Sequence, residues 1–339
     1  MTMVQDPPKK LTRKDFQTDQ DVRWCPGCGD YAILATFQKV LPELGIPQEK
    51  FAVISGIGCS SRFPYYMNTY GFHTIHGRAP TIATGLKVTR PDLSVWVITG
   101  DGDGLSIGGN HLIHCIRRNV DLNILLFNNQ IYGLTKGQYS PTSEVGKKTK
   151  STPFGSVDEP FKPLMVALGA NPSFIARTID REPKHMASIF RRSSEFRGTC
   201  CVEIYQNCNI FNDGAFLDLT ERDRKAANQL LLTHGEPMVF GPDNEYGIVF
   251  ENFAPKVVTV EEVGIEAIAI HDEQGPLAMH VAIAGMGGED FPTALGVIRA
   301  VERPTYDRMV NVQVEETKEK LGAGDLKDLL HSGDTWVID

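Results

Sequence analysis

The chain has 339 residues, of which 41% are hydrophobic, and a formal net charge of −8. This composition excludes a disordered chain and, without a dominant basic face, argues against nucleic acid as the main partner. No apolar run approaches the ~20 residues that span a bilayer, and the N-terminus lacks the apolar centre of a signal peptide. We therefore expect a cytoplasmic protein with no membrane partner. Its seven cysteines are expected as reduced thiols, metal ligands or catalytic groups, not as disulfides.

Three regions of the chain differ in their pattern. Residues 1–20 form a polar arm, residues 21–215 alternate strands and helices, and residues 216–339 form a less regular C-terminal extension. We expect strands at 51–56, 93–99, 122–127, 173–179 and 200–207, and helices at 31–44, 79–89, 106–118, 161–168 and 184–196. This alternation predicts an α/β fold with a doubly wound, mostly parallel sheet and helices on both faces.

The segment from 132 to 160 has no periodicity of a helix or strand and is long for a connecting loop. Loops of this length are usually functional or disordered. Lys147, Lys148 and Lys150 form a small basic cluster within it. We interpret this cluster as a solvated face of the loop in preference to a specific anion site.

Polar side chains follow two neighbouring apolar runs. Gly100-Asp101-Gly102 ends the first run, and Asn128-Asn129 ends the second. Ligands bind at the carboxyl ends of the strands in open α/β sheets, and glycines let the backbone approach an anion closely. Asp101 and Asn129 offer the hard oxygen ligands that Mg²⁺ prefers when it bridges two phosphates. The alternative is a doubly wound domain with ordinary polar turns at its strand ends.

The cysteines suggest a second centre. Cys25 and Cys28 form a C-x₂-C knuckle, after which Asp30 is expected to cap a helix. A thioredoxin-like motif would need a strand before the pair, and a zinc site would need a second nearby pair. Instead, Cys59 and Cys208 each follow a predicted strand, at the edge that carries Asp101. Four thiolates meeting there could hold a [4Fe–4S] cluster. A zinc-stabilised interaction module remains the alternative that is not an enzyme.

Six segments between residues 20 and 215 together resemble the β subunits of 2-oxoacid:ferredoxin oxidoreductases: CPGCGDYAIL, SGIGCSSR, HGRAPTIATGLK, GDGDGLSIGGNH, NNQIYGLTKGQYSPT and VALGANPSFIAR. The GDG…NN pair itself resembles the signature of thiamine-diphosphate enzymes. The resemblance implies a diphosphate-binding domain with thiamine diphosphate, Mg²⁺ and one [4Fe–4S] cluster. It places Mg²⁺ on Asp101, Asn129 and the carbonyl of Ile131, and the cluster on Cys25, Cys28, Cys59 and Cys208. Cys115, Cys200 and Cys201 are expected as buried structural thiols.

The same resemblance implies the residues that line the cofactor site: Ile57, Gly58, Cys59, Ser60, His76, Gly100, Gly102, Asp103, Asn129, Ile131 and Leu134. His76, Arg62 and Lys136 are the candidates for catalytic or substrate contacts. For His76 the alternative is a histidine that stabilises the turn in HGR. For Arg62 it is a surface or interface charge, because most arginines are exposed.

The implied reaction converts a 2-oxoacid, coenzyme A and oxidised ferredoxin into acyl-CoA, CO₂ and reduced ferredoxin, with CO₂ fixation as the reverse direction. Thiamine enzymes also need a glutamate from a pyrimidine-binding domain, which we do not find in this sequence. An α subunit, or α plus γ, is therefore expected to complete the site.

We expect 2-oxoglutarate as the substrate, giving succinyl-CoA. Its second carboxylate needs a fixed cation, and Arg62 fits better than Lys136 because a guanidinium pairs with a carboxylate in a bidentate fork. The YGLTKGQ segment also resembles the 2-oxoglutarate or broad-range members of the family. A pyruvate or broad-range enzyme is the first alternative, and a thiamine enzyme without a cluster is the second.

Overall fold

The computed structural model describes residues 10–252 and 254–338. The first half of the expected N-terminal arm, residues 1–9, lies outside the described residues. The remainder of the arm contains the 3₁₀ turn η1 (Arg13–Phe16), whose Phe16 is fully buried. Its ring packs edge-on against Phe51, with the ring centroids 5.6 Å apart. This part of the arm is therefore attached to the hydrophobic core.

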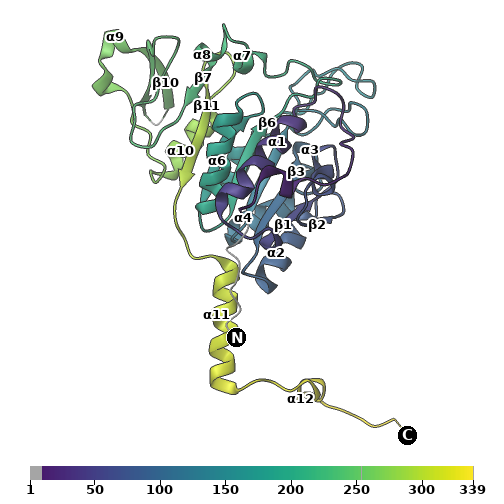
Figure 1. Ribbon diagram of the computed structural model, residues 1–339. Coiled ribbons are helices and arrows are strands. Elements are labelled where there is room, and N and C mark those ends of the chain that lie inside the picture. The colour runs from purple at the N-terminus through teal and green to yellow at the C-terminus, as the bar shows by residue number, and fades with distance from the viewer. Residues whose placement is uncertain (1–9, 253, 339) are drawn as a thin grey trace.

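Within the described residues, eight strands form one sheet in the order β2-β1-β3-β4-β6-β5-β11-β7 (Figure 1). Neighbouring strands run parallel except for β11, which is antiparallel to β5. Most strands are apolar and buried along their whole length, as expected for a parallel sheet that is covered on both faces. The predicted α/β fold with a mostly parallel sheet is thereby confirmed. The strands are β1 (Phe51–Ser55), β2 (Tyr70–His73), β3 (Ser94–Gly100), β4 (Asn123–Asn128), β5 (Phe174–Ile179), β6 (Cys200–Tyr205), β7 (Gln229–Leu231) and β11 (Thr293–Ala300).

Helices cover both faces of this sheet. On one face, α1 (Asp30–Val40) and α6 (Pro183–Glu195) enclose an aromatic core in which Phe37 packs edge-on against Trp96 and Phe190. The helices whose buried residues join the core on the other face are α2 (Ala79–Thr89), α4 (Gly109–Arg118), α5 (Pro163–Gly169) and α10 (Leu277–Gly285). The two cores alternate along each strand because successive side chains point to opposite faces.

One predicted helix begins three residues later in the structure and is preceded by a separate short helix. We expected a helix over 106–118, but helical structure begins already at α3 (Asp101–Leu105) and resumes at α4. Between them, Ser106 has non-helical torsions (φ −87°, ψ −108°), and two glycines follow at 108 and 109. The consequence is that Asp101 is the first residue of a helix that starts directly from β3.

The C-terminal region contributes to the main sheet and also forms structure of its own. Its strands β7 and β11 extend the sheet beyond β5, so the sheet continues across the domain boundary that we place at residue 215. A small antiparallel sheet contains β8 (Val239–Phe240), β9 (Tyr246–Glu251) and β10 (Ala254–Thr259). The remaining short helices of this region are α7 (Leu217–Thr220), α8 (Lys225–Asn228) and α9 (Val260–Val263).

The last two helices, α11 (Tyr306–Leu321) and α12 (Leu326–Leu330), project away from the body of the molecule (Figure 1). A hydrogen bond from Asn311 Nδ2 to the carbonyl of Val88, 3.1 Å long, ties the first half of α11 to α2. Among the described residues, no helix is long and apolar enough to cross a membrane.

Candidate functional site

Asp101 occupies the junction between β3 and α3 and is 2% exposed. Its Oδ2 accepts hydrogen bonds from Ser140 Oγ (2.5 Å) and Thr142 Oγ1 (2.7 Å), although these residues lie far along the chain. Burial raises the pKa of Asp101 to about 6, and the two hydroxyls limit the rise. A bound cation would hold this carboxylate ionised, so the site fits the predicted Mg²⁺ ligand. Ser140 and Thr142, which belong to the SPT of the long loop, were not among the residues predicted to line the site.

The two asparagines after β4 face different partners. Asn129 Oδ1 accepts a hydrogen bond from the backbone N–H of Ile131 (3.2 Å), and its Nδ2 donates to Gln206 Oε1 (2.9 Å). Asn128 Oδ1 instead accepts from Thr142 Oγ1 (2.9 Å). Thr142 therefore joins Asn128 to Asp101. The structure brings Asp101 and the two asparagines to one edge of the sheet, as the sequence predicted.

A buried ion pair lies behind Asn128. Glu203 on β6 is fully buried, accepts a hydrogen bond from Asn128 Nδ2 (2.8 Å) and pairs with Arg177 on β5 at 2.7 Å. The guanidinium of Arg177, 2% exposed, also donates to the carbonyls of Ala284 (3.1 Å) and Ala294 (3.3 Å). These two alanines belong to α10 and β11, so the pair links the C-terminal region to the strand that carries the asparagines.

Asp103 connects three loops at the same edge. Its Oδ1 accepts backbone N–H groups from Ile57 (3.0 Å) and Gly77 (2.7 Å) and lies 2.7 Å from His76 Nδ1. Its Oδ2 accepts the Thr99 hydroxyl at 2.6 Å. The imidazole of His76 remains 37% exposed, so it is positioned by Asp103 but still accessible. Three predicted cofactor-site residues, Ile57, His76 and Asp103, are thus in direct contact.

Close packing at Gly102 explains why that position needs glycine. A Cβ there would lie 2.1 Å from the ring of Tyr132, whose hydroxyl donates to the carbonyl of Gly102 at 3.2 Å. A Cβ on neighbouring Gly100 would meet Ser60 Oγ at 3.5 Å, which places Ser60 beside the start of α3. Gly58, with φ at +143°, lies in the turn just before Ser60. The loop after β1 and the loop after β4 therefore both close over the residues that follow β3.

The four predicted cluster cysteines lie on neighbouring loops, which hydrogen bonds join. A Cβ on Gly133 would lie 3.5 Å from Cys59 Sγ and 3.6 Å from Cys208 Sγ. Burial raises the pKa of Cys59 to about 12, and the neighbouring thiols of Cys208 and Cys25 add to the rise. Burial likewise raises the pKa of Cys28 well above its ordinary value, with added contributions from Cys208 and Cys59. Each of the four thiols is therefore close enough to influence at least one of the others.

Hydrogen bonds hold the cysteine loops together. The indole N–H of Trp24, which precedes Cys25, donates to the carbonyl of Cys59 at 2.7 Å. Asn209, which follows Cys208, donates to the carbonyl of Pro26 at 2.7 Å. The knuckle is thus joined to the loop after β1 and to the loop after β6.

In the described part of the chain, no group of three or more His, Cys, Asp or Glu side chains is arranged to hold a single metal ion. A zinc ion needs its ligands about 2.0–2.3 Å from one point. A [4Fe–4S] cluster binds its cysteine ligands through separate irons, so the sulfurs around it stand further apart.

Asp30 does not cap α1 as we expected. The N-cap is Gly29, and Asp30 is the first helical residue, with its side chain buried beside Cys28. Burial raises the pKa of this carboxyl to about 7. The side chain points into the thiol site and not toward the free N–H groups of the helix.

The two candidate substrate cations lie in different surroundings. Arg62 is half-buried, donates from Nε to the Tyr66 hydroxyl at 3.0 Å, and its charge acts on Cys59. Lys136 is exposed on the loop after β4, where Leu134 is also 52% exposed. Of the two, Arg62 is therefore the one whose charge acts on a predicted cluster cysteine.

The other three cysteines lie in the hydrophobic core, as expected. Cys115, Cys200 and Cys201 are each no more than 2% exposed.

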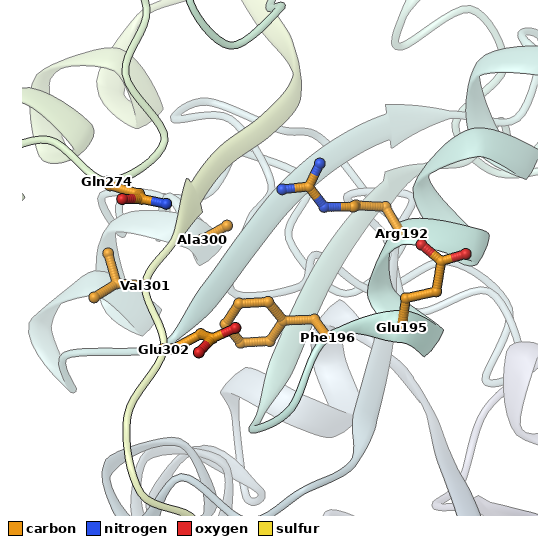
Figure 2. A pocket seen from close by; sticks show the side chains of 7 residues that line it. All are labelled: Arg192, Glu195, Phe196, Gln274, Ala300, Val301 and Glu302. Carbon is orange, nitrogen blue, oxygen red and sulfur yellow. The ribbon is translucent and has the colours of Figure 1, made fainter.

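A pocket of about 490 Å³ lies at the opposite, amino-terminal edge of the parallel strands, where Ala300 pairs with Phe174. Figure 2 shows that Arg192, Glu195 and Glu302 lie around it. It includes none of the predicted site residues.

The family profile described as "Thiamine pyrophosphate enzyme, C-terminal TPP binding domain" matches residues 56–204. This range contains the loops after β1, β3 and β4. The fold and the site thus define the diphosphate-binding domain of a thiamine-diphosphate enzyme.

Among individual relatives, the 2-oxoglutarate oxidoreductase subunit KorB of Mycobacterium tuberculosis is 52% identical over 98% of this chain and 90% of its own length. The 2-oxoglutarate synthase subunit KorB of Archaeoglobus fulgidus is 41% identical over 55% of this chain and 69% of its own. A solved 2-oxoglutarate:ferredoxin oxidoreductase from Magnetococcus marinus superimposes with a TM-score of 0.75 at 32% identity, covering 96% of this chain and 97% of that one. The chain belongs to the β subunits of the 2-oxoacid:ferredoxin oxidoreductases.

Proposed function

We propose that this chain, assembled with an α subunit, oxidises 2-oxoglutarate in the presence of coenzyme A to succinyl-CoA and CO₂ and passes the electrons to ferredoxin. The observation that carries the proposal is the 52% identity to a 2-oxoglutarate oxidoreductase subunit over nearly the whole chain, including the C-terminal third. The solved structural neighbour is described with 2-oxoglutarate, coenzyme A and succinyl-CoA bound, which supports the same substrate class.

The first part of this proposal concerns the diphosphate and its metal. Asp101, Asn129 and the carbonyl of Ile131 would hold Mg²⁺, which in turn would hold the diphosphate. Thiamine diphosphate, when bound, supplies the carbon centre that activates the keto group of the substrate. This chain contributes the buried carboxylate of Asp101 and the loops that Asp103 joins. His76, which Asp103 holds at 2.7 Å, would contact the cofactor or the substrate.

The second part of this proposal concerns the cysteines and the electron-accepting cluster that they would hold. Cys25, Cys28, Cys59 and Cys208 would hold one [4Fe–4S] cluster that accepts electrons one at a time. Metal ligation needs thiolates, whereas burial favours the protonated thiol at Cys28 and Cys59. Iron binding must therefore release protons from these side chains. The convergence of the thiols and the hydrogen bonds that join their loops support this assignment.

The third part concerns the substrate's second carboxylate. Arg62 is our first choice to bind it, because its guanidinium offers a bidentate fork. Its Nε bond to Tyr66 holds the side chain in place, and Tyr65 packs against the guanidinium at 5.5 Å from the ring centroid. Lys136 is the second choice. A pyruvate or broad-range enzyme remains the alternative.

The test uses the complex of this chain with its α subunit. CoA-dependent reduction of methyl viologen should show a higher kcat/KM for 2-oxoglutarate than for pyruvate. Arg62→Ala should lower the kcat/KM for 2-oxoglutarate and leave that for pyruvate unchanged. Arg23→Ala, which removes an exposed arginine that pairs with exposed Asp21, serves as the control. Equal losses for both substrates, or a preference for pyruvate, would show that the carboxylate argument is wrong. No turnover of any 2-oxoacid would refute the function.

A further inference from the structure

A basic pocket of about 450 Å³ lies at the loop that follows Cys208, one of the predicted cluster cysteines. Its lining contains three lysines and no acidic side chain. The lining residues are Lys136, Gly137, Lys148, Thr149, Lys150, Pro153, Ile210 and Phe211. The sequence suggested only a short run of lysines on a solvated loop. The fold adds Lys136, which comes from a different part of the same long loop, so the three charges surround one hollow.

One wall of this pocket belongs to the Cys208 loop. Ile210 and Phe211 follow Cys208 by two and three residues, and a Cβ on Gly137 would lie 2.9 Å from the ring of Phe211. Next to them, Asn212 donates its backbone N–H to the carbonyl of Cys208 at 2.9 Å. Lys147 Nζ donates to the Asn212 side chain. The lysine segment and a predicted cluster ligand are therefore parts of one hydrogen-bonded unit.

A second pocket approaches the thiols from another side and differs in charge. It has a volume of about 470 Å³ and is lined by Cys28, Tyr31, Asp180 and Arg181, among others. In this pocket the charge of Arg181 is offset by the carboxyl group of Asp180. A second carboxyl group, that of buried Asp30, lies next to Cys28. Of these two pockets, the lysine pocket is therefore the one that favours an anionic partner.

We propose that the lysine pocket is the docking surface for the small acidic iron–sulfur protein that takes electrons from this subunit. The proposal rests on the proposed function. One electron would pass from the cluster held by the four cysteines to the cluster of the docked protein. The first cluster would be oxidised and the second reduced, with no atom transferred. Phe154 and Val157, which are 98% and 89% exposed on the lysine-bearing segment, provide apolar contact area beside the charges.

The experiment compares two electron acceptors with the assembled enzyme. The variant Lys148→Glu/Lys150→Glu should raise the KM for ferredoxin at least about tenfold at low salt, because electrostatic steering changes association rates by about 10–1,000-fold. Turnover with methyl viologen, a small dication, should be unchanged. The control Lys318→Glu/Lys320→Glu makes the same charge change on α11, which projects from the body (Figure 1). It should leave both KM values unchanged.

Three results would overturn the docking surface. The first is the same ferredoxin KM in the pocket variant and the control. The second is a parallel loss of viologen turnover or a raised KM for coenzyme A, which would assign the lysines to the substrate site. The third is loss of assembly with the α subunit, which would make the pocket a subunit interface. If the unmodified complex reduces neither acceptor, the proposed function itself fails.

Discussion

Replacing Glu203 by glutamine should reduce the free energy of unfolding more than any surface substitution. Glu203 is fully buried and Arg177 is 2% exposed, so the variant leaves a guanidinium in the core without its counter-charge. Removing one partner of such a pair costs about 3–5 kcal/mol, a large part of the roughly 5–15 kcal/mol that stabilises a typical protein. At about 2 °C per kcal/mol for a large domain, the melting temperature should fall by about 6–10 °C.

The matched control is Asp218→Asn, which removes the carboxylate of an ion pair with Arg224 whose side chains are 69% and 58% exposed. Exposed pairs contribute about 0–1 kcal/mol, so differential scanning fluorimetry should show a shift of at most about 2 °C. The double variant Arg177→Met/Glu203→Leu removes both charges and should recover part of the loss. It should not recover all of it, because Asn128 keeps an unpaired amide group. Glu203→Gln melting at the same temperature as Asp218→Asn would refute this reasoning.

Three further predictions concern the proposed cofactors and partner. Cys208→Ser should lower bound iron and labile sulfide in the anaerobically purified chain, whereas Cys115→Ser, in the core, should leave both unchanged; equal iron in the two variants would contradict the cluster assignment. Asp101→Ala should weaken binding of thiamine diphosphate with Mg²⁺ by at least about 100-fold in a calorimetric titration, since an octahedral oxygen site loses its charged ligand; an unchanged affinity would exclude Asp101. The chain without its α subunit should not turn over 2-oxoglutarate with methyl viologen, and measurable turnover would show that it needs no partner's glutamate.

Much of the sheet could be predicted because its signals are local. Buried parallel strands are apolar along their whole length, and polar residues, glycines or prolines mark their ends. The helix predicted over 79–89 matches α2 because Pro80 suits a first turn and Pro91 follows the last. The position of Asp101 and Asn129 at one edge of the sheet could be predicted for the same reason. Each comes two residues after the end of an apolar run, which is Thr99 in one case and Phe127 in the other, and parallel strands bring such positions to one edge.

The hydroxyl donors to Asp101 could not be found in this way. Ser140 and Thr142 lie 39 and 41 residues beyond Asp101, in a segment without periodicity, and only the folded loop returns them to β3. Similarly, no pattern in the C-terminal region indicates that β11 pairs antiparallel with β5. Such pairing depends on long-range packing, which local sequence does not encode.

The buried ion pair is a different case, because its signal was present. Arg177 and Glu203 are the fourth residues of β5 and β6, and these strands pair in parallel with Arg177 opposite Glu203. A charge inside each of two apolar strands is rare unless the charges are paired. Aligning the two predicted strands, 173–179 and 200–207, at their first residues would have placed the two charges within one position of each other.

Gln206 gives a structural reason why the two proposed centres lie on one subunit. Its Oε1 accepts the amide of Asn129, a predicted Mg²⁺ ligand, at 2.9 Å, and its Nε2 lies 3.3 Å from Cys28 Sγ. Asn212, which is hydrogen-bonded to Cys208, also donates to the carbonyl of Asn129 at 2.9 Å. Two separate contacts from the loop after β6 therefore join Asn129, at the proposed diphosphate site, to the predicted cluster cysteines. Because Gln206 and Asn212 each contact both regions, a shift of the loop after β4 must move the loop after β6 with it. The separation between the two proposed centres is held by β4 and β6, which pair in the same sheet.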